Sequence, residues 1–263
     1  FLFFIMLIDV HCHLDFKGLR ERMDEVVANA EKVGVKAIIT SGINPETNRL
    51  ALEYASKYDI VKASFGLYPI DALEREDSSF KPFDVDDELK FLKENKDKFI
   101  CVGEVGLDLH SGKDIDRQKE IFKKVLELAK KLDKPVLIHS RKAESEALDM
   151  LEEVGVKKVV MHCFTAKKSL VKRAYDNGYY FSIPPVAVRL QQFQDMIEMI
   201  DINHLLTETD APFLSPFKNE DGSFNVNEPA YVIETVKKIA EIKKMDIEEV
   251  KKNLWMNFQK VFL

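Results

Sequence analysis

The stretch Phe3-Phe4-Ile5-Met6-Leu7-Ile8-Asp9-Val10-His11-Cys12-His13 joins an apolar run of strand length to two histidines. Successive side chains of a strand point to opposite faces, so His11 and His13 share one face at the end of the strand. Two neutral imidazoles placed in this way can bind one divalent cation. Because a His-x-His pair is about as often structural as metal-binding, the stretch alone predicts a buried strand and a candidate ligand pair.

The same pattern of apolar runs continues along the chain and alternates with amphipathic helical stripes. We expect strands at residues 4–10, 35–42, 60–66, 99–104, 135–139, 158–162, 178–183 and 204–209. One helical stripe runs from Met23 to Val33 and stops at Gly34, and Asn44-Pro45 is typical of a helix start. Eight strands, each followed by a helix, within about 250 residues predict an α/β fold of the (β/α)8 TIM-barrel class. A doubly wound open sheet is the alternative, but it lacks its glycine-rich phosphate loop here.

No repeat, low-complexity tract or Pro/Gly-rich linker divides the chain, so we expect a single TIM-barrel domain over residues 1–263. Two polar segments, 71–87 after the third strand and 215–228 after the eighth, are too long for simple connectors. Both follow the carboxyl ends of strands, the face on which barrel enzymes carry their active sites.

The amino-acid composition limits which partners and which cellular compartment we expect for this protein. The formal net charge is −6, which argues against a protein held on nucleic acid or membrane by a broad basic surface. Three cysteines without a C-x-x-C spacing predict reduced thiols rather than a disulfide framework. The apolar N-terminus lacks a basic segment and is too short to span a bilayer. We therefore expect a cytoplasmic protein with no membrane attachment, and no feature indicates an obligate protein partner.

Six polar side chains end predicted strands that are far apart in sequence. They are His11 and His13 on the first strand, Glu104 on the fourth, His139 on the fifth, His162 on the sixth and Asp210 on the eighth. In a barrel these ends form one ring, and six ligands exceed what a single tetrahedral cation needs. They suit two cations that share a carboxylate, and Glu104 is the expected bridge because it comes from the middle of the set.

Each of these residues also has an ordinary explanation. Glu104 alone fits a salt bridge at a strand end, and Asp210 before Ala211-Pro212 fits the start of a turn. We interpret His110 and His204 in this ordinary way, His204 because it begins its strand at the opposite end of the barrel. The joint placement of all six at one face is much less probable by chance than any single placement.

A pair of divalent cations against two carboxylates leaves about two positive charges, which suits an anionic substrate. Such a centre lowers the pKa of a bridging water and clamps the oxygens of an in-line displacement. Glu104 and Asp210 are the expected catalytic residues, and Asp210 would orient or deprotonate that water. Arg141, just past His139, is a candidate for a phosphate contact. Glu208 is a candidate either for a substrate contact or for support behind the ligands, and an ordinary salt bridge is the alternative for both.

Six short segments together resemble the TatD-like metal-dependent hydrolases, commonly described as TatD-related deoxyribonucleases. They are Asp9 to Asp15 (DVHCHLD), Val102 to Asp108 (VGEVGLD), Pro135 to Arg141 (PVLIHSR), Met161 to Phe164 (MHCF), Thr207 to Pro212 (TETDAP) and Asn227 to Ala230 (NEPA). The resemblance implies a TIM barrel that hydrolyses ester bonds, most often phosphodiesters of DNA, with two divalent metal ions, which would be Zn²⁺, Mg²⁺ or Mn²⁺. It implies one metal ion among His11, His13, Glu104 and Asp210, and the other among Glu104, His139 and His162.

The chain departs from the family pattern near the substrate. Family members usually carry a histidine where this chain has Tyr68, within Gly66-Leu67-Tyr68-Pro69. A tyrosine can donate a hydrogen bond but cannot shuttle a proton near neutral pH, so Tyr68 is expected to contact substrate in an altered role. The loop before Asn227 often carries arginine in relatives, and here Lys218 is its only cation.

Three hypotheses follow. The leading one is a deoxyribonuclease that acts on DNA ends or single-stranded DNA. The second is a hydrolase of a small phosphoester, lactone or amide on the same scaffold, although not one with a carboxylated lysine bridge, because the fourth strand carries Glu104. The third is a metal-binding scaffold with little catalysis, which Tyr68 and the missing loop arginine motivate.

Overall fold

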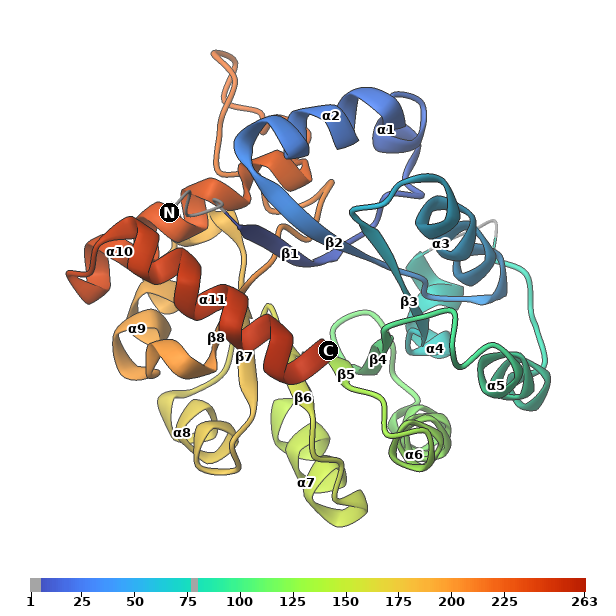
Figure 1. Cartoon of the computed structure of the whole chain (residues 1–263). Helices are drawn as coiled ribbons and strands as arrows, with labels where there is room; N and C mark the ends of the chain where they lie inside the picture. The colour runs from blue at the N-terminus through green and yellow to red at the C-terminus, as the bar shows by residue number, and fades with distance from the viewer. Residues whose placement is uncertain (1–5, 77–79) are drawn as a thin grey trace.

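The chain folds around eight parallel strands that follow one another in sequence order (Figure 1). This computed structural model describes residues 6–76 and 80–263. The strands are β1 (Leu7–Cys12), β2 (Val35–Ser41), β3 (Val61–Leu67), β4 (Cys101–Asp108), β5 (Val136–Arg141), β6 (Val159–His162), β7 (Tyr180–Ile183) and β8 (Leu205–Thr207). All eight predicted strands are therefore present, and the part of the first prediction that covers residues 4–5 lies outside the described residues.

Consecutive strands pair in parallel from β1 to β8, and a seam of backbone hydrogen bonds joins the chain just after β8 to β1. At the seam, the backbone N–H of Asp210 donates to the carbonyl of His11 at 2.9 Å, and the N–H of His13 donates to the carbonyl of Ala211 at 2.8 Å. The predicted (β/α)8 TIM barrel is thus confirmed, and its seam lies between two of the predicted ligands.

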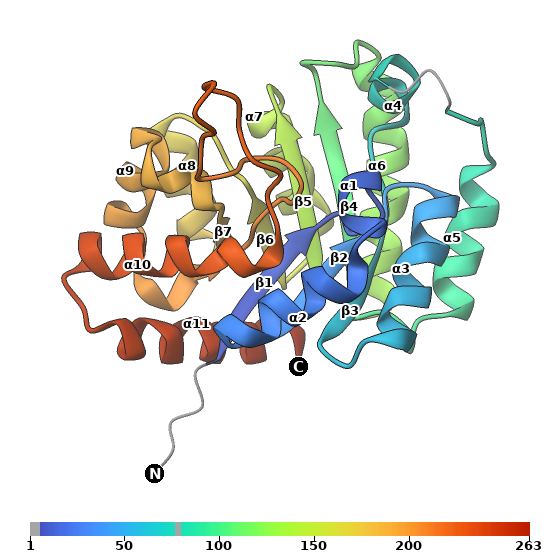
Figure 2. The ribbon, with the colours of Figure 1, turned by 90° about the horizontal axis from the view of Figure 1, so that it is seen from above.

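Helices surround the barrel and return the chain to the start of each next strand (Figures 1 and 2). They are α1 (Lys17–Arg20), α2 (Met23–Val33), α3 (Pro45–Lys57), α4 (Ile70–Glu76), α5 (Val85–Glu94), α6 (Ile115–Lys131), α7 (Glu144–Val154), α8 (Lys168–Asp176), α9 (Gln191–Met199), α10 (Val232–Lys243) and α11 (Ile247–Phe262), with 3-10 turns η1 (Pro185–Val188), η2 (Ile202–His204) and η3 (Pro229–Tyr231). Figure 2 shows α11 at the end of the barrel where the strands begin. No described helix has the length and apolar character that a membrane crossing requires.

The helix ends follow the predicted signals. The stripe from Met23 forms α2, which ends at Gly34 in the left-handed conformation with φ 97°. Asn44 caps α3, because its side chain accepts a hydrogen bond from the backbone N–H of Thr47 at 3.0 Å. Gly34 thus fixes where the chain leaves α2 and enters β2, and Asn44 fixes where it enters α3.

Two strand boundaries differ from the prediction and change where the candidate ligands sit. β4 continues four residues past Glu104, and β5 continues past His139, so both side chains lie within strands rather than at their ends. The pairing continues because Val105 and Leu107 are buried and β4 stays in register with β5 as far as Asp108. Gly106 permits this close approach, since a Cβ there would collide with the carbonyl oxygen of His139.

The two long polar segments lie at the carboxyl ends of the strands (Figure 2). The first contains most of α4 and the beginning of α5, and residues 77–79 within it lie outside the described part of the chain. The second runs from Ser215 to Glu228 without a helix or strand, apart from one bridge between Lys218 and Phe224. Both segments therefore border the mouth of the barrel, as the sequence predicts.

Candidate metal centre

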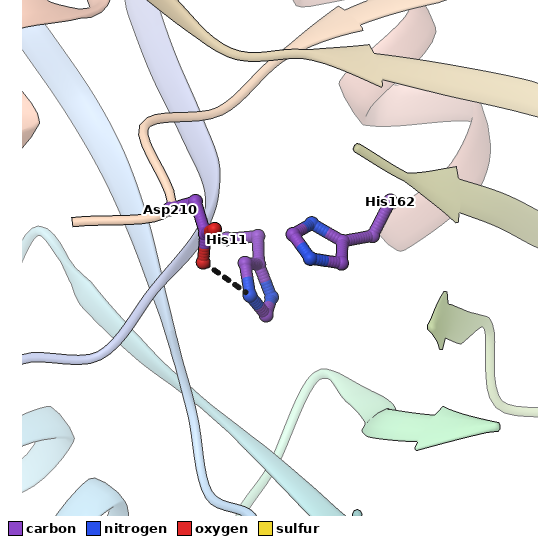
Figure 3. Close-up of side chains that lie close together, drawn as sticks. All are labelled: His11, His162 and Asp210. Atoms are coloured by element: carbon purple, nitrogen blue, oxygen red, sulfur yellow. Dashed lines mark ion pairs between the residues drawn. The ribbon is translucent and has the colours of Figure 1, made fainter. Parts of the chain in front are cut away.

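All six predicted ligands converge at the mouth of the barrel. They form three overlapping groups in which potential ligand atoms lie within 4.8 Å of one another: His11, His162 and Asp210; His11, His13 and Glu104; and Glu104, His139 and His162. Figure 3 shows His11 between Asp210 and His162, with Nε2 of His11 3.4 Å from Oδ1 of Asp210. Residues from five different strands or strand ends thus meet in one cluster that could hold metal.

Glu104 lies at the centre of the cluster, and its two carboxylate oxygens face different histidines. Oε2 lies 3.4 Å from Nε2 of His13 and 3.7 Å from Nε2 of His11. Oε1 lies 2.8 Å from Nδ1 of His139 and 3.6 Å from Nε2 of His162. The carboxylate therefore divides the cluster into two halves, which is the arrangement that a bridging ligand needs.

Hydrogen bonds on the outer side of the rings fix which nitrogen faces the centre. Nδ1 of His13 donates to the backbone carbonyl of Ser41 at 3.2 Å, and Nδ1 of His162 donates to the carboxylate of Glu208 at 2.9 Å. A carbonyl or carboxylate oxygen only accepts, so these contacts place the proton on Nδ1. When these rings are neutral, as ligation requires, the lone pair of Nε2 therefore points toward Glu104.

His11 provides an independent sign that the cluster fits a cation. Its Nδ1 pairs with the hydroxyl of Ser41 at 2.9 Å, while its Nε2 is fully buried and has no hydrogen-bond partner among the described residues. A buried polar atom without a partner destabilises a fold by about 1–3 kcal/mol. A cation between His11, Glu104 and Asp210 would remove that cost, so the residues present fit the metal ions that the sequence predicts.

Asp210 is held by the end of β8 and by the loop that follows. Its backbone adopts φ 53°, in the left-handed region that aspartate enters more easily than most residues. The side chain of Asn227 donates to the carbonyls of Thr209 at 2.7 Å and Phe213 at 2.6 Å, on either side of Asp210. With 15% of its side chain exposed, Asp210 is the carboxylate of the cluster most open to the mouth.

The electrostatics keep both central carboxylates charged. Burial favours the neutral acid, but His13 and His139 outweigh burial and lower the pKa of Glu104 well below its usual value. Burial also opposes charge on Asp210, and its contacts with His11 and His13 again prevail and lower its pKa. Both groups are therefore carboxylates at neutral pH and can ligate a cation or accept a proton.

Asp108, at the end of β4, holds the outer side of His139 and was missed by the sequence analysis. Its Oδ2 accepts from Nε2 of His139 at 2.9 Å and from the hydroxyl of Tyr68 at 2.9 Å. Oδ1 accepts from the backbone N–H groups of His110 and Ser111, both at 2.8 Å. Glu104 and Asp108 are four residues apart on one strand, so strand alternation places them on the same face. That spacing was the available signal.

Asp108→Asn is expected to weaken binding of a cation at Glu104, His139 and His162 about 10- to 100-fold. An amide can donate to Nε2 of His139, which leaves the proton on Nδ1 where the lone pair is needed. Calorimetric titration of the metal-free protein with Mn²⁺ or Zn²⁺ measures this without reference to turnover. Tyr68→Phe, which removes only a neutral hydrogen bond, is the control and should have a smaller effect. Unchanged affinity in Asp108→Asn would show that Asp108 does not position His139.

The remaining predicted site residues lie in three different settings. Tyr68 is buried against the ring of His139, with ring centroids 4.7 Å apart, and its hydroxyl lies 3.1 Å from Nε2 of that ring. Glu208 is fully buried and accepts from His162 and from the N–H of Cys163 at 3.0 Å, which fits support behind the ligands rather than substrate contact. Arg141 is exposed at the end of β5 and forms no ion pair within the described residues.

The other histidines and the cysteines lie outside the cluster of ligands. His110 is exposed, and His204 contacts the rings of Tyr175, edge to face, and Tyr180 at the opposite end of the barrel. The cysteines form no disulfide, and Cys12 points to the carbonyl of Ile39, away from its histidine neighbours. None of these residues belongs to the three groups that could hold metal.

Comparisons with known proteins agree on one family. The family model described as TatD related DNase matches residues 8–263. The uncharacterized metal-dependent hydrolase MJ1582 of Methanocaldococcus jannaschii is 32% identical over 260 residues, which cover 98% of this chain and 97% of that protein. Human deoxyribonuclease TATDN3 is 30% identical over 263 residues, covering 97% and 94%. The crystal structure of YjjV, a TatD homolog from Escherichia coli, has a TM-score of 0.85 and 27% identity over 97% of each chain.

Proposed function

The chain belongs to the family of TatD-related DNases and is a metal-dependent hydrolase of that family, and from this premise we propose that it cleaves phosphodiester bonds of DNA. The proposed substrates are DNA ends and single-stranded DNA. The name of the human relative, a deoxyribonuclease, supports this proposal. The names of the other relatives do not decide the substrate, because two that are 32% identical to this chain are described only as metal-dependent hydrolases.

One observation carries the proposal: the carboxylate of Glu104 faces a different set of histidines with each of its oxygens. We assign one divalent cation to His11, His13, Glu104 and Asp210, and a second to Glu104, His139 and His162. When bound, two such cations supply Lewis-acid activation of water and neutralise the charge that develops on a phosphate. The cations would be Zn²⁺, Mg²⁺ or Mn²⁺, since imidazole favours the first and phosphate chemistry the other two.

The chain's own residues then have distinct tasks. Asp210, ionised and open to the mouth, accepts a proton from the attacking water or orients it. Asp108 and Glu208 hold the rings of His139 and His162 from behind, so that the centre is rigid before substrate arrives. Arg141 lies two residues beyond His139 on the same face of β5, where an unpaired guanidinium can hold a phosphate oxygen.

Binding of metal is expected to release about two protons at pH 7. Burial disfavours a charged ring, but Asp108 and Glu104 outweigh it and raise the pKa of His139 to about 9. Asp210 and Glu104 likewise raise the pKa of His13 well above its usual value against the effect of burial. Both rings are thus protonated without metal at pH 7, whereas burial lowers the pKa of His11 and of His162 and keeps them neutral.

Because ligation requires four neutral rings, metal affinity should fall as pH decreases below about 9, where His139 gains its proton. Calorimetric titration in two buffers of different ionisation enthalpy measures the number of protons released. A binding enthalpy that does not depend on the buffer would contradict the protonation of His13 and His139 in the metal-free protein at pH 7.

The proposal is tested by assaying labelled DNA beside a panel of small phosphoesters, lactones and amides, each with Mg²⁺, Mn²⁺ and Zn²⁺. We expect cleavage of DNA that stops on chelation and returns when metal is added. Turnover of the small esters alone would reject the nuclease in favour of the second hypothesis. Inactivity on every substrate at full metal occupancy would favour a metal-binding scaffold. A cytoplasmic location and the lack of an obligate protein partner stay predictions from the sequence.

A further inference from the structure

Exposed phenylalanines gather at the mouth of the barrel, beside the candidate metal centre. Phe16, Phe213, Phe217 and Phe224 keep 39%, 47%, 41% and 44% of their surface exposed. They come from the chain just after β1 and from the long segment after β8, and among the described residues they are the phenylalanines exposed to this degree. Exposed aromatic side chains that cluster beside a site usually serve to bind a ligand, because aromatic side chains without such a role are mostly buried in the core.

The pair formed by Phe16 and Phe213, which we call the aromatic platform, directly borders a candidate ligand. Their ring centroids are 4.9 Å apart at an interplanar angle of 82°. The ring of His13 lies 6.2 Å from Phe16 and 6.4 Å from Phe213, and Nε2 of His13 is 3.4 Å from Glu104. A planar group resting on the platform would therefore be a near neighbour of any phosphate held at the centre.

The position of the platform is fixed relative to Asp210. The backbone N–H of Phe213 donates to the carbonyl of Asp210 at 2.8 Å, and the carbonyl of Phe213 accepts from the side chain of Asn227 at 2.6 Å. These bonds hold the backbone of Phe213 three residues from Asp210, so its side chain projects from a fixed point beside the centre. Rigid positioning reduces the entropy lost on binding.

Positive charge lies beside Phe224, in the segment after β8, and comes from that segment and from the chain after η1. The guanidinium carbon of Arg189 lies 4.3 Å from the centroid of the Phe224 ring, and Nζ of Lys218 lies 5.1 Å from it. Neither cation forms an ion pair within the described residues. Unpaired cations next to exposed aromatic rings match a ligand that carries both phosphates and planar bases, the combination that single-stranded nucleic acid presents.

We propose that the aromatic platform stacks the nucleobase next to the scissile phosphate of a single-stranded nucleic acid, while Arg189 and Lys218 contact phosphates further along the strand. This inference rests on the proposed phosphodiesterase function and specifies its substrate. Bases inside a duplex are already stacked on their neighbours, so the platform selects single strands and frayed ends over internal duplex.

The test compares a single-stranded oligonucleotide with one that lacks the base next to the scissile bond. Two quantities are measured: kcat/KM for each, and the affinity of phosphorothioate versions, which resist hydrolysis, by fluorescence anisotropy. Stacking of one base contributes about 5- to 150-fold in affinity, so the wild-type protein should prefer the intact strand by an amount in that range. Phe213→Ala and Phe16→Ala should each lose most of this preference and leave the abasic strand unaffected, whereas Phe213→Trp should retain it.

Met256→Ala is the matched control, because Met256 is also 47% exposed but lies on α11 at the other end of the barrel. It should behave as the wild-type protein on both strands. Arg189→Gln should weaken both strands alike and reduce the dependence of log affinity on log salt by about 0.7. This separates the contribution of charge from that of stacking.

The outcomes distinguish the platform from the function on which it rests. Phenylalanine variants that bind both strands as the wild-type protein does would overturn the platform alone. Equal weakening of the intact and the abasic strand would also overturn it, because the loss would then come from a disturbed centre near His13. A wild-type protein that turns over small esters but neither binds nor cleaves DNA would overturn the proposed function, and the platform with it.

Discussion

Glu104→Gln is expected to abolish binding of at least one of the two cations and to reduce turnover about a thousand-fold or more. The substitution keeps the shape of the side chain but removes the charge, and each oxygen of Glu104 faces a different pair of histidines. Metal activation contributes several kcal/mol to transition-state stabilisation, and each 1.36 kcal/mol is worth a factor of ten in rate. Elemental analysis of the purified variant and its kcat/KM measure the two effects.

The matched control for this variant is Glu228→Gln. Glu228 is also buried near the mouth of the barrel, but it pairs with Arg22 at 2.9 Å and accepts from Asn29 at 3.1 Å. It should keep the metal content and the turnover of the wild-type protein. A Glu104→Gln protein with unaltered metal content and turnover would show that the carboxylate is not a bridge.

Asp210→Asn is expected to lower kcat about 10²- to 10⁴-fold, the usual contribution of a positioned general base. The side chain of Asp210 is ionised, and 15% of it is exposed, compared with 4% of the side chain of Glu104. Asp210 is therefore more open to the mouth of the barrel than Glu104. An asparagine can still offer a carbonyl oxygen to a cation, so metal content should fall less than turnover. KM should change little, since the loss falls in the transition state.

The control for Asp210→Asn is Asp221→Asn, which neutralises an exposed acid within the segment after β8. It should leave kcat unchanged. If Asp210→Asn lost metal in proportion to its loss of turnover, Asp210 would be a ligand without a separate role toward water. If it kept more than about a tenth of wild-type kcat, a catalytic role would be rejected altogether.

The sequence predicted the strands, the barrel and the convergence of the six candidate ligands because each depends on a local or periodic signal. Alternating apolar runs mark strands, Gly34 and Asn44 mark helix ends, and parallel strands bring their carboxyl ends to one face. The convergence of His11 with Asp210, 199 positions apart in the chain, follows from barrel closure alone.

Strand lengths and the residues behind the ligands were harder to predict. An acid usually marks the end of a buried strand, so Glu104 was expected at the end of β4, yet the strand continues because Gly106 admits β5 so closely. Asp108 shares a strand face with Glu104, four residues earlier, but neither Asp108 nor Ser41 stands in a pattern that names its partner. Their roles depend on which side of His139 or His11 faces the protein, and that is set by packing across strands.

Anomalous scattering from crystals grown with Mn²⁺ tests the shared carboxylate most directly. It should reveal two peaks about 3.5–4 Å apart, one on each side of Glu104, the first beside His11, His13 and Asp210 and the second beside His139 and His162. A single peak at full occupancy, or peaks away from Glu104, would contradict the account.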